Sequence, residues 1–263
     1  MNRFETIELQ VNEGLATLTL NRPEQANAMN PLMAKELSDV ATQLSEQRDL
    51  RCVLIKSTGK LFCAGGDIAE FAEADADVGR LIRAMAGDLH MAISRLTRLD
   101  APIVCAVQGT AAGAGLSLCV AADFVIAVDS AKFTSAYTKA GLSPDGSSTY
   151  FLPRRIGDRR ARELMLTNRV LSAEEAVAWG LINEAVSADV FDTQVEQRVA
   201  SFVSGPTKAF GSVKRLLNES SHTSLETQME LETREIANCA MGVDGQEGIQ
   251  AFLAKRTPVF KGE

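Results

Sequence analysis

The chain has 263 residues, of which 46% are hydrophobic, and a formal net charge of −7. This length and apolar content suffice for one large domain or two smaller ones with a sizeable core, and the negative charge argues against a nucleic-acid-binding surface. Neither a leader-peptide pattern nor an apolar run long enough to span a bilayer is recognisable, so we expect a cytoplasmic protein without a membrane segment.

Short apolar runs of β-strand character alternate with helical patterns along the first two thirds of the chain. Asn30 and Pro31 predict the start of a helix, and Ser172 with Glu175 predicts a capping box for a later helix that Gly180 ends. Beyond about residue 207 the pattern is helical throughout. The alternation predicts mixed α/β layers with parallel strand crossovers. The predicted strands are residues 15–20, 52–57, 103–108 and 124–128.

Two glycine-bearing turns, CAGGD (residues 63–67) and GTAAGAG (109–115), each follow an apolar strand and precede an apolar helical segment. Small side chains let a ligand carbonyl approach the backbone, and the helix N-terminus adds partial positive charge. The second turn lacks the Gly-Lys-Ser/Thr ending of a phosphate loop and a complete G-x-G-x-x-G pattern. We therefore interpret the pair as an oxyanion hole, in which two N–H groups face one oxygen, with strand-to-helix turns free of chemistry as the alternative.

Two further features bear on the site. The acidic segment FAEADADVG (71–79) predicts either a mobile segment beside an acyl pocket or a solvated surface loop. The five cysteines are scattered and lie mostly in apolar runs, so we interpret them as reduced core residues rather than disulfides or metal ligands.

Longer segments carry a family resemblance. LNRPEQANAM (20–29), FCAGGD (62–67), VQGTAAGAG (107–115), GLSPD (141–145) and EGIQAFLAKR (247–256) are similar to the enoyl-CoA hydratase/isomerase (crotonase) superfamily. The resemblance runs nearly end to end. It implies an α/β fold with a crotonase-type β-β-α spiral core over residues 1–205 and a helical C-terminal region over residues 206–263. That region would pack against neighbouring subunits in a homotrimer or a dimer of trimers.

The resemblance also implies positions for a thioester site. The N–H groups of Gly66 and Ala114 would form the oxyanion hole, and the Ala64 carbonyl would bind the adenine amino group of CoA. Phe252 and Lys255 would cover the nucleotide, although an amphipathic helix could equally place Phe252 in a core. CoA is part of the substrate here, and no metal or separate cofactor is implied. The residues expected to bind CoA are Ala64, Gly65, Asp67, Gly113, Phe252 and Lys255.

The acid/base residue distinguishes reactions within this superfamily. Hydratases use two glutamates at positions that hold Ser117 and Tyr137 here, and a hydroxyl replaces a water-activating carboxylate poorly. Asp145 instead matches the catalytic aspartate of phenylacetate-pathway ring-epoxide isomerases and Δ3,Δ2-enoyl-CoA isomerases. It also matches the nucleophile of 4-chlorobenzoyl-CoA dehalogenases. Without the family context, Asp145 would be a turn residue in Pro-Asp-Gly.

We therefore predict an acyl-CoA isomerase of fatty acid or phenylacetate catabolism that uses Asp145 as its acid/base. His90 matches the histidine of the dehalogenases, whereas Tyr137 and Gly66 depart from their aromatic residues. Three further functions stay open: a hydratase as the family-level activity, a dehalogenase-like reaction of Asp145 with His90, and a non-catalytic CoA-thioester binder. The arginines of residues 154–162 lack interleaved aromatic side chains and carry no prediction of RNA binding.

Overall fold

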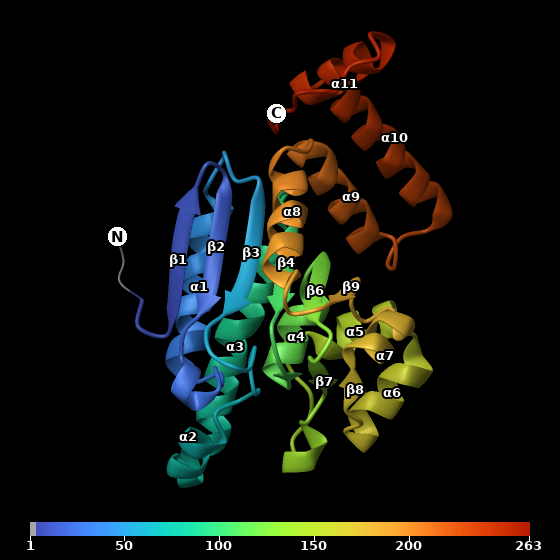
Figure 1. The fold of residues 1–263 in the computed structure, drawn as a ribbon. Coiled ribbons are helices and arrows are strands. Elements are labelled where there is room, and N and C mark those ends of the chain that lie inside the picture. The colour runs from blue at the N-terminus through green and yellow to red at the C-terminus, as the bar shows by residue number, and fades with distance from the viewer. Residues whose placement is uncertain (1–3) are drawn as a thin grey trace.

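A six-stranded sheet forms the centre of the protein in a computed structural model that describes residues 4–263 (Figure 1). The strand order is β1-β2-β3-β4-β6-β9; β1 and β2 form an antiparallel hairpin, and every other pair is parallel. A second, small sheet has the order β5-β7-β8. The strands of the large sheet are β1 (Ile7–Asn12), β2 (Leu15–Leu20), β3 (Cys52–Ser57), β4 (Ile103–Val107), β6 (Phe124–Val128) and β9 (Glu184–Val186). Those of the small sheet are β5 (Ala111–Ala112), β7 (Lys132–Thr134) and β8 (Leu171–Ser172).

The predicted α/β architecture and its four strands are therefore confirmed. All five residues of β4 are buried, as are the first four of β3. Parallel strands that are covered on both faces need apolar residues at successive positions rather than in alternation, which is why these runs were recognisable in the sequence.

Two helices cover the first strands of the sheet (Figure 1). In α1 (Pro31–Ser45) the Asn30 side chain accepts a hydrogen bond from Met33 N at 2.9 Å, as the predicted N-cap requires. α1 packs along α3 (Val78–Leu96). Between them in the sequence lie the short helix α2 (Ile68–Glu73) and the 3-10 turn η2 (Asp75–Asp77). The faces that α1 and α3 share are apolar, so burial of these side chains holds the pair together.

The middle of the chain adds a helical layer beside the small sheet. α4 (Ala114–Ala121) is completely buried and follows the second glycine turn directly. The next helices are α5 (Ser148–Ile156), α6 (Asp158–Thr167) and α7 (Ala173–Trp179), with the 3-10 turn η3 (Thr138–Ala140) before them. The predicted capping box is present at α7, where the Ser172 and Glu175 side chains each bond the other's backbone N–H.

The C-terminal helices leave the core. α8 (Phe191–Val203) packs on β3, β4 and β6, whereas α9 (Thr207–Glu219), α10 (Leu225–Met241) and α11 (Val243–Leu253) extend away from the sheet (Figure 1). No side chain of α10 is fully buried, and apolar residues such as Ile236, at 72% exposure, face outward. The prediction of helix throughout this region is wrong for residues 254–263, which follow α11 without regular secondary structure. The division at residues 205/206 stays a prediction.

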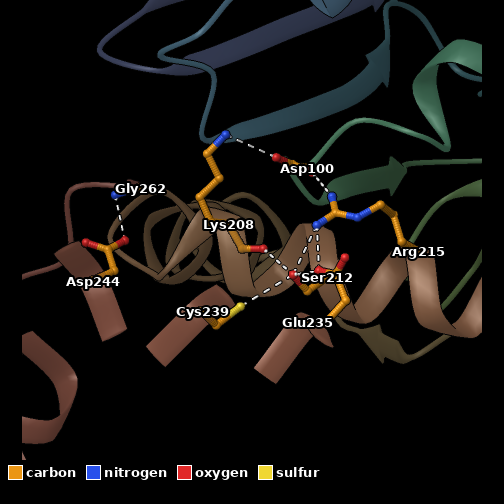
Figure 2. A network of polar contacts seen from close by, with 8 residues as sticks. All are labelled: Asp100, Lys208, Ser212, Arg215, Glu235, Cys239, Asp244 and Gly262. Carbon is orange, nitrogen blue, oxygen red and sulfur yellow. Dashed lines mark hydrogen bonds and ion pairs between the residues drawn. The ribbon is translucent and has the colours of Figure 1, made fainter. Parts of the chain in front are cut away.

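Polar contacts fasten this helical region to the core (Figure 2). Asp100, which precedes β4, contacts Lys208 at 3.4 Å and also pairs with Arg215 of α9. Arg215 in turn contacts Glu235 of α10 at 2.9 Å, and the hydrogen bond from Ser212 followed by this guanidinium lowers the pKa of Glu235. Asp244, which is 4% exposed, accepts hydrogen bonds from Lys261 N at 2.6 Å and Gly262 N at 2.7 Å. The chain end is thus held against the start of α11.

Among the helices of residues 4–263, none combines the length and the apolar character needed to cross a bilayer.

Candidate active site

The two predicted glycine turns lie against each other. Cys63 and Ala111 form an isolated parallel bridge, and Ala112 N donates to Cys63 O at 2.9 Å. Gly65 has φ +104° and Gly113 has φ +50°, both in the region that favours glycine. A Cβ added to Gly113 would lie 3.1 Å from Gly65 Cα. The close approach of the two turns therefore depends on glycine at position 113, while the backbone conformation favours glycine at position 65.

Both predicted oxyanion donors belong to these turns. Met29 N donates to Gly65 O at 2.6 Å, and Asp67 N donates to Met29 O at 2.9 Å. In this parallel bridge the N–H group of Gly66 points away from Met29. Ala114 is the first residue of α4, where an N–H group points out of the helix and has no partner within it. Within residues 4–263 neither N–H group has an acceptor. Both residues line the same cavity, as one shared ligand oxygen would require.

The cavity at these turns has a volume of about 450 Å³, within the range of small-molecule sites. Its walls come from both turns, from α2 and α3, and from the segment around η3. The apolar side chains on it are Ile68, Phe71, Ile82, Met85 and Leu142. The polar side chains are Arg83, Tyr137, Lys139, Ser143 and Asp145. An acyl chain would find apolar contacts here, with charged and hydroxyl groups at a few positions.

Asp145, the predicted acid/base, lies on this cavity wall and is partly buried. Tyr137 OH donates a hydrogen bond to Asp145 Oδ1 at 2.6 Å. The backbone carbonyl of Asp145 accepts a hydrogen bond from Ser148 Oγ at 2.8 Å, and Ser117 Oγ lies 3.2 Å from the same carbonyl oxygen. The turn that carries the carboxylate is therefore held at both its backbone and its side chain. Asp145 thus lines the same cavity as Gly66 and Ala114, while its role as the acid/base stays a prediction.

The two hydroxyl residues at the hydratase positions lie beside Asp145. Ser117 is completely buried in α4, and its Oγ lies 3.1 Å from Tyr137 OH. Burial, reinforced by the negative charge of Asp145, raises the pKa of Tyr137 above its usual range. Tyr137 is therefore a neutral hydrogen-bond donor at physiological pH. The sequence marked these residues only as departures from the hydratase pattern; their contact with Asp145 was not predicted.

Four of the predicted CoA-binding residues belong to the turns, but Asp67 has a different surrounding. Ala64, Gly65 and Gly113 line the cavity. The Asp67 side chain accepts a hydrogen bond from Glu70 N at the start of α2 and pairs with Arg22 at 3.0 Å. At 8% exposure and engaged in this way, Asp67 holds the first turn in shape rather than facing the cavity.

Phe252 and Lys255 are not brought to the cavity within one chain. Both lie at or just after the end of α11, at the opposite end of the molecule from α2 (Figure 1). Phe252 is 83% exposed, so the alternative that it occupies a core position is wrong for the single chain. The cations that do line the cavity are Arg83 and Lys139. Arg83 could have been found from the sequence, because it follows Gly79 by one helical turn on α3.

The acidic segment 71–79 is helical rather than an extended loop. It contains the end of α2, the turn η2 and the start of α3. Phe71, at 9% exposure, and Gly79 line the cavity, while Asp75 and Asp77 are exposed. The predicted position beside the pocket is confirmed, whereas the surface-loop alternative is wrong about the secondary structure.

His90 does not line the cavity that holds Asp145. Its Nε2 accepts a hydrogen bond from Gly146 N at 3.1 Å. It lines a separate cavity of about 650 Å³ among α3, α5 and α9. His90 thus contacts the backbone of the turn that carries Asp145. To activate a water molecule beside the acyl group, as a dehalogenase-like reaction requires, His90 would have to line the cavity of Asp145, which it does not.

Cys52, Cys63, Cys105 and Cys119 are buried as predicted, whereas Cys239 is only partly buried. Burial raises the pKa of Cys63 to about 11, so this thiol in the first turn is protonated near neutral pH and is no nucleophile. In residues 4–263 no group of three or more His, Cys, Asp or Glu side chains is arranged to hold a metal ion.

Comparison with known proteins finds relatives that cover nearly the whole chain. Residues 10–263 match the family model described as enoyl-CoA hydratase/isomerase. The chain is 37% identical to 1,2-epoxyphenylacetyl-CoA isomerase of Escherichia coli, over 99% of this chain and 100% of the relative. It is 38% identical to a protein of Rhodobacter capsulatus named "Probable enoyl-CoA hydratase", over 98% and 99% of the two chains. A solved enoyl-CoA hydratase from Polaromonas sp. JS666 superposes with a TM-score of 0.91 at 31% identity, covering 97% of this chain and 99% of that one.

Proposed function

The chain belongs to the enoyl-CoA hydratase/isomerase family, and we propose that it is an acyl-CoA isomerase that moves a double bond through a thioester enolate. The observation that carries this proposal is the composition of the cavity wall. Among the described residues, Asp145 is the only acidic side chain lining the cavity with the N–H groups of Gly66 and Ala114. One carboxylate and two oxyanion donors are sufficient for an isomerase.

The reaction needs only proton transfer. The Asp145 carboxylate takes a proton from C2 of a 3-enoyl thioester, and the electrons of that C–H bond delocalise onto the thioester oxygen. The N–H groups of Gly66 and Ala114 stabilise the resulting negative oxygen. Asp145 then returns the proton to C4, which gives the 2-enoyl isomer. No atom is gained or lost.

Hydration is the second candidate, because relatives with hydratase names cover the chain end to end. A hydratase must activate water, and general-base catalysis at neutral pH depends on a group that can accept a proton. Ser117 is a neutral hydroxyl, and Tyr137 is held neutral by its raised pKa. Both therefore favour isomerisation over hydration.

A dehalogenase and a non-catalytic binder are weaker candidates. A dehalogenase-like reaction would need His90 to activate water beside Asp145, but its Nε2 accepts from Gly146 N and it lines another cavity. A non-catalytic CoA-thioester binder would not need a carboxylate on the wall of the acyl cavity. The Escherichia coli relative's name raises a further substrate class, a ring epoxide, on which the same acid could act.

We also propose that the C-terminal region completes the site in an oligomer. Ala64, Gly65 and Gly113 would contact CoA within one chain. Phe252 and Lys255 would reach a CoA molecule only from another copy, in a homotrimer or dimer of trimers, because they lie at the far end of their own chain (Figure 1). The exposed apolar side chains of α10 support this proposal. We propose cytoplasmic fatty acid or phenylacetate catabolism as the setting.

The proposal is tested by giving the protein a 3-enoyl-CoA and, separately, a 2-enoyl-CoA, and following the products by liquid chromatography, which separates the double-bond isomers, coupled to mass spectrometry. We expect the 3-enoyl ester to give an isomer of unchanged mass, and the 2-enoyl ester to add water at a negligible rate. Hydration at a rate comparable to isomerisation would overturn the assignment. No reaction with either ester would favour an epoxide substrate or a binder, which an epoxide-bearing aryl-CoA would then distinguish.

A further inference from the structure

We propose that Tyr137 is a positioning residue that orients the Asp145 carboxyl group for proton transfer, with Ser117 as its hydrogen-bond donor. This inference rests on the proposed function, because it assumes that Asp145 moves the proton. It assigns a joint role to Tyr137 and Ser117, which in the sequence were distinguished only by standing where hydratases have glutamates.

The hydrogen bond to Asp145 distinguishes the two oxygens of the carboxylate. Tyr137 OH donates to Oδ1 at 2.6 Å, while no residue of the described chain donates to Oδ2. A carboxylate held by one oxygen has its rotation about the Cβ–Cγ bond restricted. Oδ2 is then the atom available for the substrate proton. The hydrogen bond to a charged acceptor is also among the stronger kinds in proteins.

Ser117 supports the phenol from behind. Its Oγ lies 3.1 Å from Tyr137 OH, and its other oxygen neighbours are the carbonyls of Gly113 and Asp145, each at 3.2 Å. Tyr137 uses its only hydroxyl hydrogen on Asp145, so Ser117 is the donor when the two hydroxyls bond to each other. A chain of donors that ends on a negative charge is polarised toward that charge.

The backbone fixes the position of the Tyr137 ring. Ala140 N and Leu142 N both donate to Tyr137 O, at 3.0 and 3.1 Å, and Tyr137 N donates to Ser135 O at 2.8 Å. The ring also lies against the second glycine turn, since a Cβ on Gly113 would be 3.9 Å from Tyr137 Cζ. Tyr137 therefore lies against the turn that carries the Ala114 N–H and is also hydrogen-bonded to the Asp145 carboxylate.

The charges around the pair keep the direction of the bond fixed. Burial, followed by the charge of Asp145, raises the pKa of Tyr137, so the phenol donates rather than accepts across the physiological pH range. The other titratable groups that face this region are Arg83 of α3 and Lys139 of η3 on the cavity wall, and His90, which contacts Gly146. Within the described residues neither Arg83 nor Lys139 donates a hydrogen bond to Asp145, so they do not compete with Tyr137 for Oδ1.

The first experiment compares Tyr137→Phe with Tyr150→Phe in the isomerase assay. These are the only two tyrosines, and Tyr150 lies outside the acyl cavity, with its hydroxyl 3.3 Å from His222. We expect Tyr137→Phe to lower kcat by roughly 10- to 100-fold, the effect of losing one hydrogen bond to a charged group, with KM changed less than about 3-fold. Tyr150→Phe should match the parent. Equal kcat in both variants would overturn the inference.

A second variant guards against a folding effect. Ser117→Ala keeps the phenol and removes the hydroxyl that contacts it, together with that hydroxyl's contacts to the Gly113 and Asp145 carbonyls, and we expect a loss of kcat smaller than that of Tyr137→Phe. The two losses together should be less than additive, because both residues act through Asp145. Fully additive losses would contradict a single hydrogen-bonded chain.

The last measurement does not depend on activity. In a Tyr150→Phe background Tyr137 is the sole tyrosine, and its ionisation can be followed by ultraviolet absorbance over the alkaline pH range in which circular dichroism shows that the protein is still folded. We expect Asp145→Asn to move this ionisation to lower pH, since the charge that opposes it is gone. No movement would overturn the inference. If the Tyr137 ionisation shifts but the parent protein isomerises no ester, the proposed function is wrong, while the interaction between Tyr137 and Asp145 is confirmed.

Discussion

Replacing Ala114 by proline would remove one oxyanion donor while leaving the helix that carries it in place. Ala114 is the first residue of α4, a position at which proline is favoured because the N–H has no partner within the helix. The preceding Gly113 has no Cβ to clash with the proline ring. The substitution therefore removes the hydrogen bond from the Ala114 N–H to the ligand oxygen and no hydrogen bond within the helix.

The size of the effect follows from the site. Ala114 is 3% exposed, so its N–H acts with little competition from water. Removal of one such donor from an oxyanion hole costs about 2.7–4 kcal/mol in the transition state, which is roughly a 100- to 1,000-fold loss in kcat/KM. Since the proline Cδ also occupies the place of the hydrogen, we state the prediction for kcat/KM rather than for kcat alone.

The matched control is Val243→Pro, at the first position of α11 on the far side of the molecule (Figure 1). Steady-state isomerase kinetics and urea unfolding would be measured for both variants. We expect the control to retain parental kcat/KM and both proteins to unfold within about 1 kcal/mol of the parent. An Ala114→Pro enzyme within 10-fold of the parent, or a control equally impaired, would refute the assignment of Ala114 as a donor.

Three further outcomes follow from the same structure. Asp145→Asn should bind a saturated acyl-CoA, which keeps the thioester carbonyl but has no double bond to move, within about 3-fold of the parental Kd by calorimetry, because the oxyanion and CoA contacts are unchanged; a much weaker complex would make Asp145 a binding residue. Ser117→Glu should not gain hydration and should lower stability by about 1–3 kcal/mol in urea, since a Cβ on Gly146 would already lie 2.7 Å from Ser117 Cβ; water addition by this variant would contradict the prediction. Burial raises the pKa of the Cys52 thiol to about 12 and that of Cys63 to about 11, from an ordinary 9.0. These protonated thiols favour the folded state below pH 9, and that contribution is lost as the pH rises through 11–12, so urea unfolding should show lower stability at pH 10 than at pH 8, and equal stability would count against it.

The parts of the fold that depend on local pattern could be predicted from the sequence. β4 is apolar at every position because both faces are covered, and the capping box at Ser172 needs only residues three apart. The glycine turns were recognisable as a pair because each stands between a strand and a helix. In these cases the physical cause lies within a few residues of its effect.

Contacts between distant residues could not be predicted in this way. Asp67 pairs with Arg22, 45 positions earlier, and nothing local to the first turn indicates that its carboxylate is engaged. The hydrogen bond from Tyr137 to Asp145 depends on how the η3 turn folds back. The position of Phe252 depends on the direction in which α10 and α11 leave the core, which a helical pattern does not determine (Figure 1).

The most direct test of the account is the turnover of a 3-enoyl-CoA in heavy water by the parent and by Asp145→Asn, measured by chromatographic separation of the double-bond isomers and mass spectrometry of each. The account predicts that the parent forms the 2-enoyl isomer, with any deuterium entering at C2 or C4, and that the variant loses this turnover by a factor of roughly 100 to 10,000, the usual contribution of general acid–base catalysis. Turnover by Asp145→Asn close to that of the parent would contradict the account and remove Asp145 from the reaction.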